Sequence, residues 1–103
     1  MAVFRVTEII DGNTIRVAGW VWSAGSYQGT KVKIAGYTTS PASTEYGMLL
    51  KNRLTNLLLG KDVELKNVTK ADKGIVQKDD ILYCSVYLND VDISKYFPEL
   101  KQT

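Results

Sequence analysis

The stretch VFRVTEIIDGNTIRV, residues 3–17, decides the fold of this chain. Its first half, Val3 to Ile10, is rich in β-branched residues, which favour strands. Asp11-Gly12-Asn13 is a sequence typical of a tight turn. After the turn, residues 14–17 alternate polar and apolar side chains, as a strand with one buried face does. The stretch therefore predicts a β-hairpin.

One helix is predicted in the middle of the chain. Four leucines recur there at helical spacing and form an apolar stripe: Leu50, Leu54, Leu57 and Leu58. Ser43 or Thr44 is suited to cap the start of this helix, and Glu45 lies in the first turn, where the helix dipole favours a negative charge. Gly60 is suited to end it.

Three further strands are predicted, at residues 31–35, 63–68 and 81–88. Residues 23–29 are rich in Gly and Ser and predict a turn, whereas the charged residues 70–80 predict a loop or a hairpin tip. A short terminal segment is expected over residues 91–96, and Pro98 is expected to stop it.

The predicted elements follow one another as three strands, one helix and two strands. Five short strands expose hydrogen-bonding edges unless their sheet closes or is covered. A five-stranded, OB-fold-like Greek-key barrel with one main helix after strand three meets this requirement. We therefore predict a mainly β (α+β) fold in one domain, residues 1–103.

Composition limits the classes of function. The 103 residues are 45% hydrophobic and carry a formal net charge of +2, an excess too small to indicate nucleic-acid binding unless the cations cluster. The single cysteine, Cys84, lies in an apolar alternating stretch and is expected to be a buried thiol in a reducing compartment, the cytoplasm. Residues 1–5 show no leader pattern, and no apolar run is long enough to cross a membrane, so no membrane contact is expected.

Five short motifs match, in order, those of one known family. They are Val6-Thr7-Glu8-Ile9-Ile10-Asp11-Gly12-Asn13-Thr14, the run from Val32 to Pro41, Tyr46-Gly47-Met48-Leu49-Leu50, Leu57-Leu58-Leu59-Gly60-Lys61-Asp62-Val63, and the run from Cys84 to Ile93. Through them, Val6 to Ile93 resembles the staphylococcal nuclease, or thermonuclease-like, family. The resemblance implies an OB-fold barrel and calcium-dependent cleavage of nucleic acid.

The family's calcium ligands fall on residues that cannot replace them. Its two aspartates correspond to Asn13 and Thr38, which are neutral, while its threonine is kept as Thr39. Calcium needs several oxygen ligands, most of them carboxylates. Asp11 is kept but is predicted to shape the turn. We therefore expect neither a metal nor another cofactor in this chain.

The other catalytic groups implied by the resemblance are also missing. The glutamate that acts as base corresponds to Pro41 or Ala42, neither of which can take a proton. The two arginines correspond to Lys33, which keeps the charge without the bidentate fork, and to Ile81. The chain is predicted to be a degenerate, catalytically inactive member with no catalytic residue.

Two groups of carboxylates lie near these positions. Glu45 is expected to act on the helix dipole rather than in catalysis. The run Lys78-Asp79-Asp80 could serve a relocated site, but a run of charges at a hairpin tip is expected to be solvated.

Binding of single-stranded nucleic acid is the first hypothesis for function. OB-type barrels stack bases on aromatic side chains within a basic groove. The candidates are Trp20, Trp22, Tyr27 and Tyr37, with Arg16, Lys31 and Lys33 beside them. Trp20 and Trp22 share one face of a strand, and the alternative is that they cover the barrel or pack on the helix.

Two other hypotheses come from different classes. The second is an interaction or scaffold module that binds a protein, or a second copy, through an uncovered barrel face, because the family's later helices are missing after Ile93. The third is a divergent metal-dependent nuclease with a relocated site.

Overall fold

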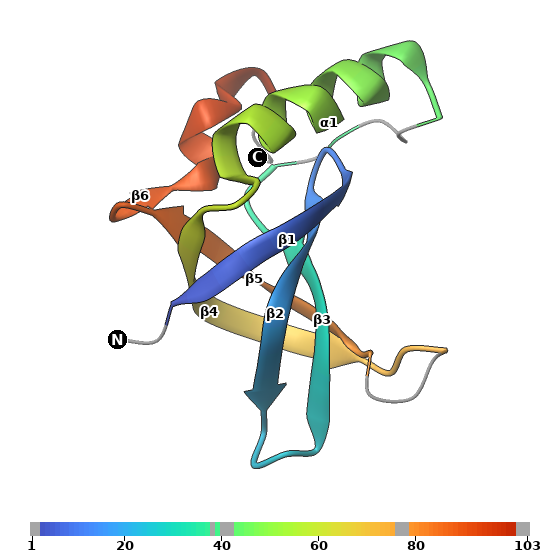
Figure 1. The fold of residues 1–103 in the computed structure, drawn as a ribbon, viewed down its shortest axis with the longest axis vertical. Helices are drawn as coiled ribbons and strands as arrows, with labels where there is room; N and C mark the ends of the chain where they lie inside the picture. The colour runs from blue at the N-terminus through green and yellow to red at the C-terminus, as the bar shows by residue number, and fades with distance from the viewer. Residues whose placement is uncertain (1–2, 38, 40–42, 76–78, 101–103) are drawn as a thin grey trace.

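The computed structural model describes residues 3–37, 39, 43–75 and 79–100 (Figure 1). Its elements are β1 (Phe4–Asp11), β2 (Thr14–Trp22), β3 (Tyr27–Ile34), α1 (Glu45–Leu58), β4 (Asp62–Asp72), β5 (Ile81–Leu88), β6 (Val91–Asp92), and the short 3-10 helices η1 (Ile93–Tyr96) and η2 (Pro98–Leu100). All the predicted strands and the predicted helix are present.

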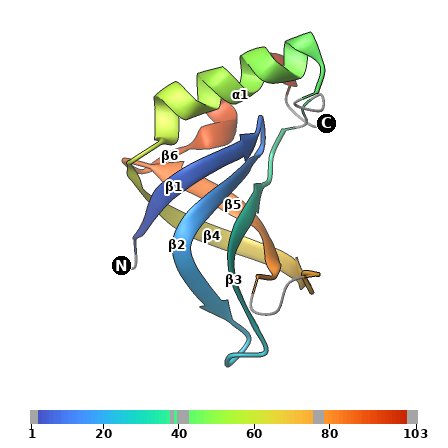
Figure 2. The same cartoon turned by 45° about the vertical axis from the view of Figure 1, so that its right-hand side comes forward.

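Five strands close into a barrel. β1 pairs with β2, β2 with β3, β1 with β4 and β4 with β5, all antiparallel, and the parallel pairing of β3 with β5 closes the ring. The two residues of β6 add to β5 at one edge. This arrangement confirms the predicted OB-fold-like barrel with its helix after strand three (Figure 2).

The hairpin of β2 and β3 is longer than predicted. The turn covers only residues 23–26, where Ser23 and Ala24 have φ of 58° and 55°. Residues 27–29, expected in the turn, pair with β2, with Gly29 opposite Trp20. A Cβ on Gly29 would lie 2.5 Å from the backbone nitrogen of Asp80, so this glycine permits a close approach that local sequence does not reveal.

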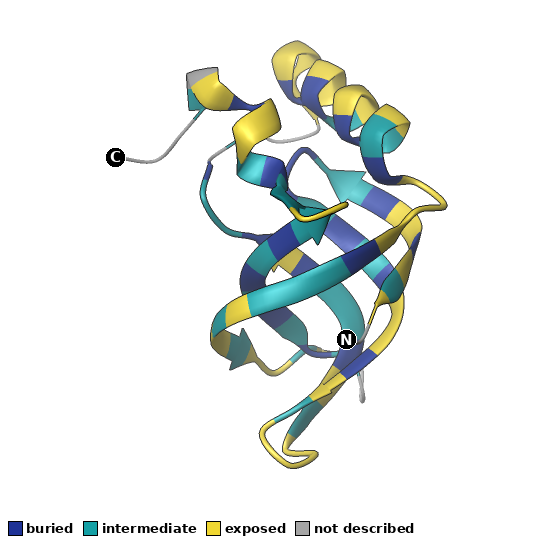
Figure 3. Cartoon of the chain, turned by 90° about the vertical axis from the view of Figure 1, so that its left-hand side faces the viewer, coloured by how far each residue is buried: buried dark blue, intermediate teal, exposed yellow. Residues whose placement is uncertain are grey.

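Helix α1 covers one end of the barrel (Figure 3). Its inward side buries Leu50, Leu54 and Leu58, each contributing about 1.5–3 kcal/mol of burial free energy. The Thr44 hydroxyl accepts the Gly47 N–H at 3.0 Å, so Thr44 rather than Ser43 caps the helix. The chain leaves the helix through Gly60 at a φ of 78°, as predicted.

The barrel interior is apolar. Cys84 lies there, which confirms the predicted buried thiol, and burial raises its pKa to about 12. No helix in the described part of the chain has the length and apolar character needed to cross a membrane.

Candidate nucleic-acid interface

The turn between β1 and β2 is held by its own polar groups. The Asp11 carboxylate accepts the Asn13 N–H at 3.2 Å, and the Tyr37 hydroxyl donates to the Gly12 carbonyl at 2.7 Å. A Cβ on Gly12 would lie 2.9 Å from Cβ of Leu50, so the turn packs closely under α1. Asp11 therefore shapes the turn, as predicted.

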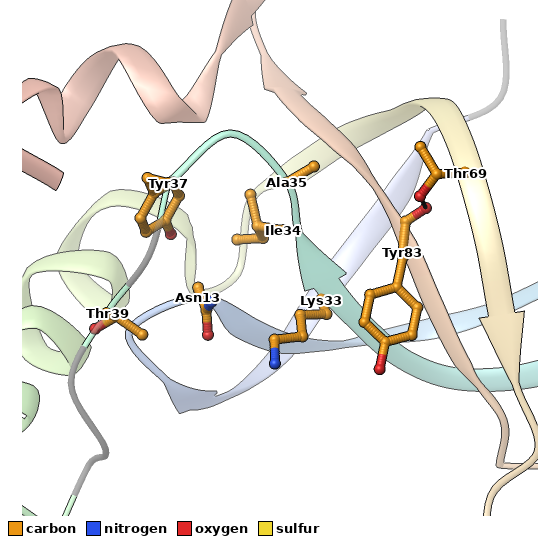
Figure 4. Close-up of a pocket in the computed structure, with 8 residues that line it drawn as sticks. All are labelled: Asn13, Lys33, Ile34, Ala35, Tyr37, Thr39, Thr69 and Tyr83. Carbon is orange, nitrogen blue, oxygen red and sulfur yellow. Dashed lines mark hydrogen bonds between the residues drawn. The ribbon is translucent and has the colours of Figure 1, made fainter. Parts of the chain in front are cut away.

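A hollow of about 370 Å³ opens between this turn and the hairpin of β4 and β5, which we call the Lys33 hollow (Figure 4). Its lining residues are Asn13, Lys33, Ile34, Ala35, Tyr37, Thr39, Thr69 and Tyr83. The fold thus brings together Asn13, Lys33 and Thr39, three positions that the resemblance implies for catalysis. Ile81 does not line this hollow, and Thr38, Pro41 and Ala42 lie outside the described residues.

The Lys33 hollow has a donor set unsuited to a divalent cation. Its described lining contains no carboxylate, and the Asn13 side-chain oxygen already accepts the Thr14 hydroxyl at 3.3 Å. Among the residues that the structure describes, no three His, Cys, Asp or Glu side chains gather into a metal-binding group. The Lys33 ammonium instead suits an anion, whereas the hydroxyl groups of Tyr37 and Thr69 already donate to the carbonyls of Gly12 and Tyr83.

Trp20 and Tyr37 lie in the core rather than on the surface. Trp20 is only 3% exposed and its Nε1 donates to the Lys31 carbonyl at 2.9 Å. Tyr37 is 2% exposed and stacks on Phe97 at a centroid distance of 4.5 Å, and burial, followed by the charge of Asp11, raises its pKa. Because both rings are covered, neither can stack a base in this structure, and for Trp20 the alternative of covering the barrel holds.

Trp22 and Tyr27 flank the turn of the β2–β3 hairpin. Their ring centroids are 5.8 Å apart and both side chains are partly buried. The ammonium of Lys73 lies 4.6 Å from the centroid of Tyr27. This pair is therefore engaged with the loop between β4 and β5 and does not line the Lys33 hollow.

The three predicted cations differ in their availability. Arg16 is bound to the Glu8 carboxylate at 2.9 Å, to the Thr30 hydroxyl at 2.7 Å and to Asp79 at 3.4 Å. Within the described part of the chain, Lys31 and Lys33 form no ion pair. The lysines, and not the arginine, are therefore free to meet a ligand.

An outward row of side chains on β5 was missed by the sequence reasoning. Tyr83, Ser85 and Tyr87 point out of the barrel, while Cys84 and Val86, which alternate with them, point in. Lys70 lies 4.6 Å from the Tyr83 centroid, and Lys66 lies 4.6 Å from the Tyr87 centroid. The two-residue alternation of this strand is the signal that could have revealed the row.

These residues form one continuous surface, because Lys33 of β3 pairs with Tyr83 of β5, and Lys70 of β4 pairs with Tyr83 from the other side. We call it the basic–aromatic face; its members are Lys31, Lys33, Lys66, Lys70, Tyr83 and Tyr87. Asp72 borders it, 4.0 Å from Lys70. Partial burial and then the Asp72 carboxylate raise the pKa of Tyr83, which keeps its hydroxyl protonated.

Asp80 is buried and Asp79 is partly buried, and both are hydrogen-bonded within the fold, so the expectation of a solvated hairpin tip is wrong for them. The Asp80 carboxylate, 6% exposed, accepts the Gln28 N–H at 3.1 Å and the Gly74 N–H at 3.0 Å. Asp79 accepts the Thr30 N–H at 3.3 Å and the Thr30 hydroxyl at 2.8 Å. The third residue of the run, Lys78, lies outside the described residues.

Both aspartates are held in the ionised form. Hydrogen bonds from the backbone, led by that of Gly74, lower the pKa of Asp80. Burial alone would raise the pKa of Asp79, but the Thr30 hydrogen bonds and the charge of Arg16 together lower it. A carboxylate committed in this way is a poor general base. Glu45 is exposed in the first turn of α1, the position expected for a dipole role.

No protein-family model matches the chain, and the comparisons with curated proteins and with solved structures gave no match either.

Proposed function

We propose that this barrel is a catalytically inactive binding module that takes an extended single strand of nucleic acid on the basic–aromatic face. The observation that carries the proposal is the pairing of Lys70 with Tyr83 and of Lys66 with Tyr87, with Lys33 beside Tyr83. The resemblance of residues 6–93 to a nuclease family supports the same class of ligand.

The pairing has a simple physical use. A lysine over a partly exposed tyrosine ring such as Tyr83 or Tyr87 gains on the order of 1 kcal/mol, so the ammonium can leave the ring for a phosphate. The uncovered ring can then stack a base, which is worth about 1–3 kcal/mol. Tyr83 and Tyr87 are four residues apart on β5, which is about 13 Å along a strand, so they offer two separate places to an extended ligand.

The proposal leaves the Lys33 hollow as an anion site without catalysis. It supplies the Lys33 ammonium, and its described lining lacks the carboxylates that would hold calcium beside a phosphate. With a net charge of only +2, the chain is expected to bind weakly and to depend strongly on salt. A cytoplasmic location belongs to the same proposal, supported by the single, buried cysteine.

Fluorescence anisotropy with a labelled single-stranded oligonucleotide of mixed sequence tests the proposal. Measured at two salt concentrations, Kd is expected to rise with salt, and Lys33→Ala should reduce the slope of log K against log salt by about 0.7. Tyr83→Leu is expected to weaken binding by about 1–3 kcal/mol. Lys61→Ala and Tyr46→Leu remove the same groups from exposed positions outside the face and should change little.

The second part of this experiment tests for cleavage in the presence of calcium. The proposal expects intact oligonucleotide after incubation with the protein and added calcium. Metal-dependent cleavage by purified protein that is lost in Asp79→Asn would instead support a relocated nuclease site. Absence of binding at low salt would remove the nucleic-acid proposal altogether.

A protein-interaction module is the second candidate, because α1 exposes apolar side chains. Tyr46 and Leu49, one helical turn apart, are 47% and 62% exposed. Leu49→Glu is expected to abolish any self-association through this helix, since it would bury a charge. Sedimentation velocity on the parent chain and on the variant checks this; a concentration-independent monomer in both would dismiss self-association there.

A further inference from the structure

A second hollow lies along the same seam between β3 and β5. It measures about 350 Å³ and is lined by Lys31, Lys73, Gly74, Ile75, Asp79 and Ile81; we call it the Asp79 hollow. Lys31 pairs with Ile81 two residues before Lys33 pairs with Tyr83. The Asp79 hollow is therefore one alternate-residue step, about 6.6 Å, from the Lys33–Tyr83 pair of the basic–aromatic face.

The walls of the Asp79 hollow combine the features that a nucleobase needs. Ile75 and Ile81 supply apolar surface for the faces of a ring, and the Ile75 side chain is fully exposed. Lys31, which forms no ion pair among the described residues, can bind a phosphate beside that base, whereas Lys73 already donates to the Ser26 carbonyl and lies 3.5 Å from Asp80. A volume of about 350 Å³ is within the range of small-ligand sites.

One carboxylate oxygen of Asp79, Oδ2, can accept a further hydrogen bond. Its Oδ1 atom accepts both the backbone N–H and the hydroxyl of Thr30. Its Oδ2 atom receives one long bond, from Arg16 at 3.4 Å, so a lone pair is left among the described contacts. The side chain is 21% exposed and lines the hollow, so a ligand in the hollow would lie beside this carboxylate.

We infer that the Asp79 hollow receives one base of the bound strand and that the Asp79 Oδ2 atom accepts a hydrogen bond from an amino group on that base. A cytosine offers this amino group, whereas thymine and uracil present a carbonyl oxygen at the same place, which a carboxylate repels. The inference rests on the proposed function and adds a preference for cytosine over thymine in the strand.

The test compares two homopolymers of equal length, oligo(dC) and oligo(dT), by anisotropy at mildly alkaline pH, where cytosine is neutral. Oligo(dC) is expected to bind about fivefold more tightly or better. Equal binding of the two would overturn the base preference and leave the proposed function standing. Binding of neither would overturn the proposed function itself.

A matched pair of variants separates base reading from charge. Asp79→Asn should remove the preference for oligo(dC), because an amide can donate to thymine. Glu8→Gln removes the same charge from the other carboxylate partner of Arg16, outside the hollow, and should keep the preference. Loss of the preference in both variants would contradict the assignment.

A change in the ligand tests the same contact without touching the protein. An oligonucleotide of pyrimidin-2-one, which is cytosine without its amino group, should bind the parent protein less tightly than oligo(dC), because it has no donor for the Asp79 carboxylate. Binding equal to that of oligo(dC) would overturn the inference even if the Asp79 variants failed to fold.

Discussion

Asp80 ties the loop before β5 to the start of β3 with a single buried carboxylate. It accepts N–H groups from Gln28 and Gly74, and its own N–H donates to the Gln28 carbonyl at 3.0 Å. Lys73 approaches the same carboxylate at 3.5 Å. Removing it would leave two backbone donors without partners, and unpaired buried donors are costly.

Asp80→Ala is therefore expected to lower the thermal midpoint by about 4–8 °C. Thermal unfolding followed by circular dichroism measures the shift. Asp72→Ala provides the control, because Asp72 is an exposed aspartate of the same hairpin. Equal midpoints for the two variants would show that the buried bonds of Asp80 do not hold the loop.

At the scale of the element, the start of α1 depends on one hydroxyl. The sequence left Ser43 and Thr44 as equal candidates, and the structure places Thr44 at the cap, with the Gly47 N–H bound to it. Thr44→Ala is expected to cost about 1 kcal/mol in the free energy of unfolding, measured by urea denaturation. Ser43→Ala, one residue earlier at an exposed position, should leave it unchanged.

Elements with a periodic pattern of their own could be predicted from sequence, and those formed by distant contacts could not. The leucines of α1 and the alternation of β5 are visible locally. The extension of β3 back to Tyr27 depends on pairing with Trp20, Val21 and Trp22. Likewise, Asp79 and Asp80 are ordered by Gln28 and Thr30, about 50 residues away, so their charge run looked solvated.

At the scale of the whole molecule, some residues of the candidate site could be predicted from the sequence and others could not. Lys31 and Lys33 were predicted and do lie on the basic–aromatic face, whereas Trp20 and Tyr37 proved to be core residues. The tyrosines of β5 lie beside lysines only because barrel closure brings β3 and β4 to either side of them. Barrel closure, a property of the whole chain, therefore decides which aromatic residues a ligand can meet.

We also predict that the stability of the closed barrel depends on pH. Asp79 and Asp80 precede β5, the strand whose parallel pairing with β3 closes the ring, and both bind β3 as carboxylates. Their pKa values are lowered from 3.8 in the folded protein, so the unfolded chain takes up protons first as pH falls. Their stabilisation is therefore complete well above pH 3.8 and is lost as the pH falls through the lowered values.

We expect the thermal midpoint to be level between about pH 7 and pH 5 and to fall steeply below about pH 4. The double variant Asp79→Asn, Asp80→Asn should start from a lower midpoint and fall less steeply in acid, because these two groups no longer titrate. The exposed Arg5–Asp62 pair, at 2.6 Å, also involves a carboxylate of lowered pKa, so Asp62→Asn serves as the comparison. If the thermal midpoint fell equally steeply below pH 4 in the parent and in the double variant, the acid sensitivity would come from groups outside the contact between the β4–β5 loop and β3.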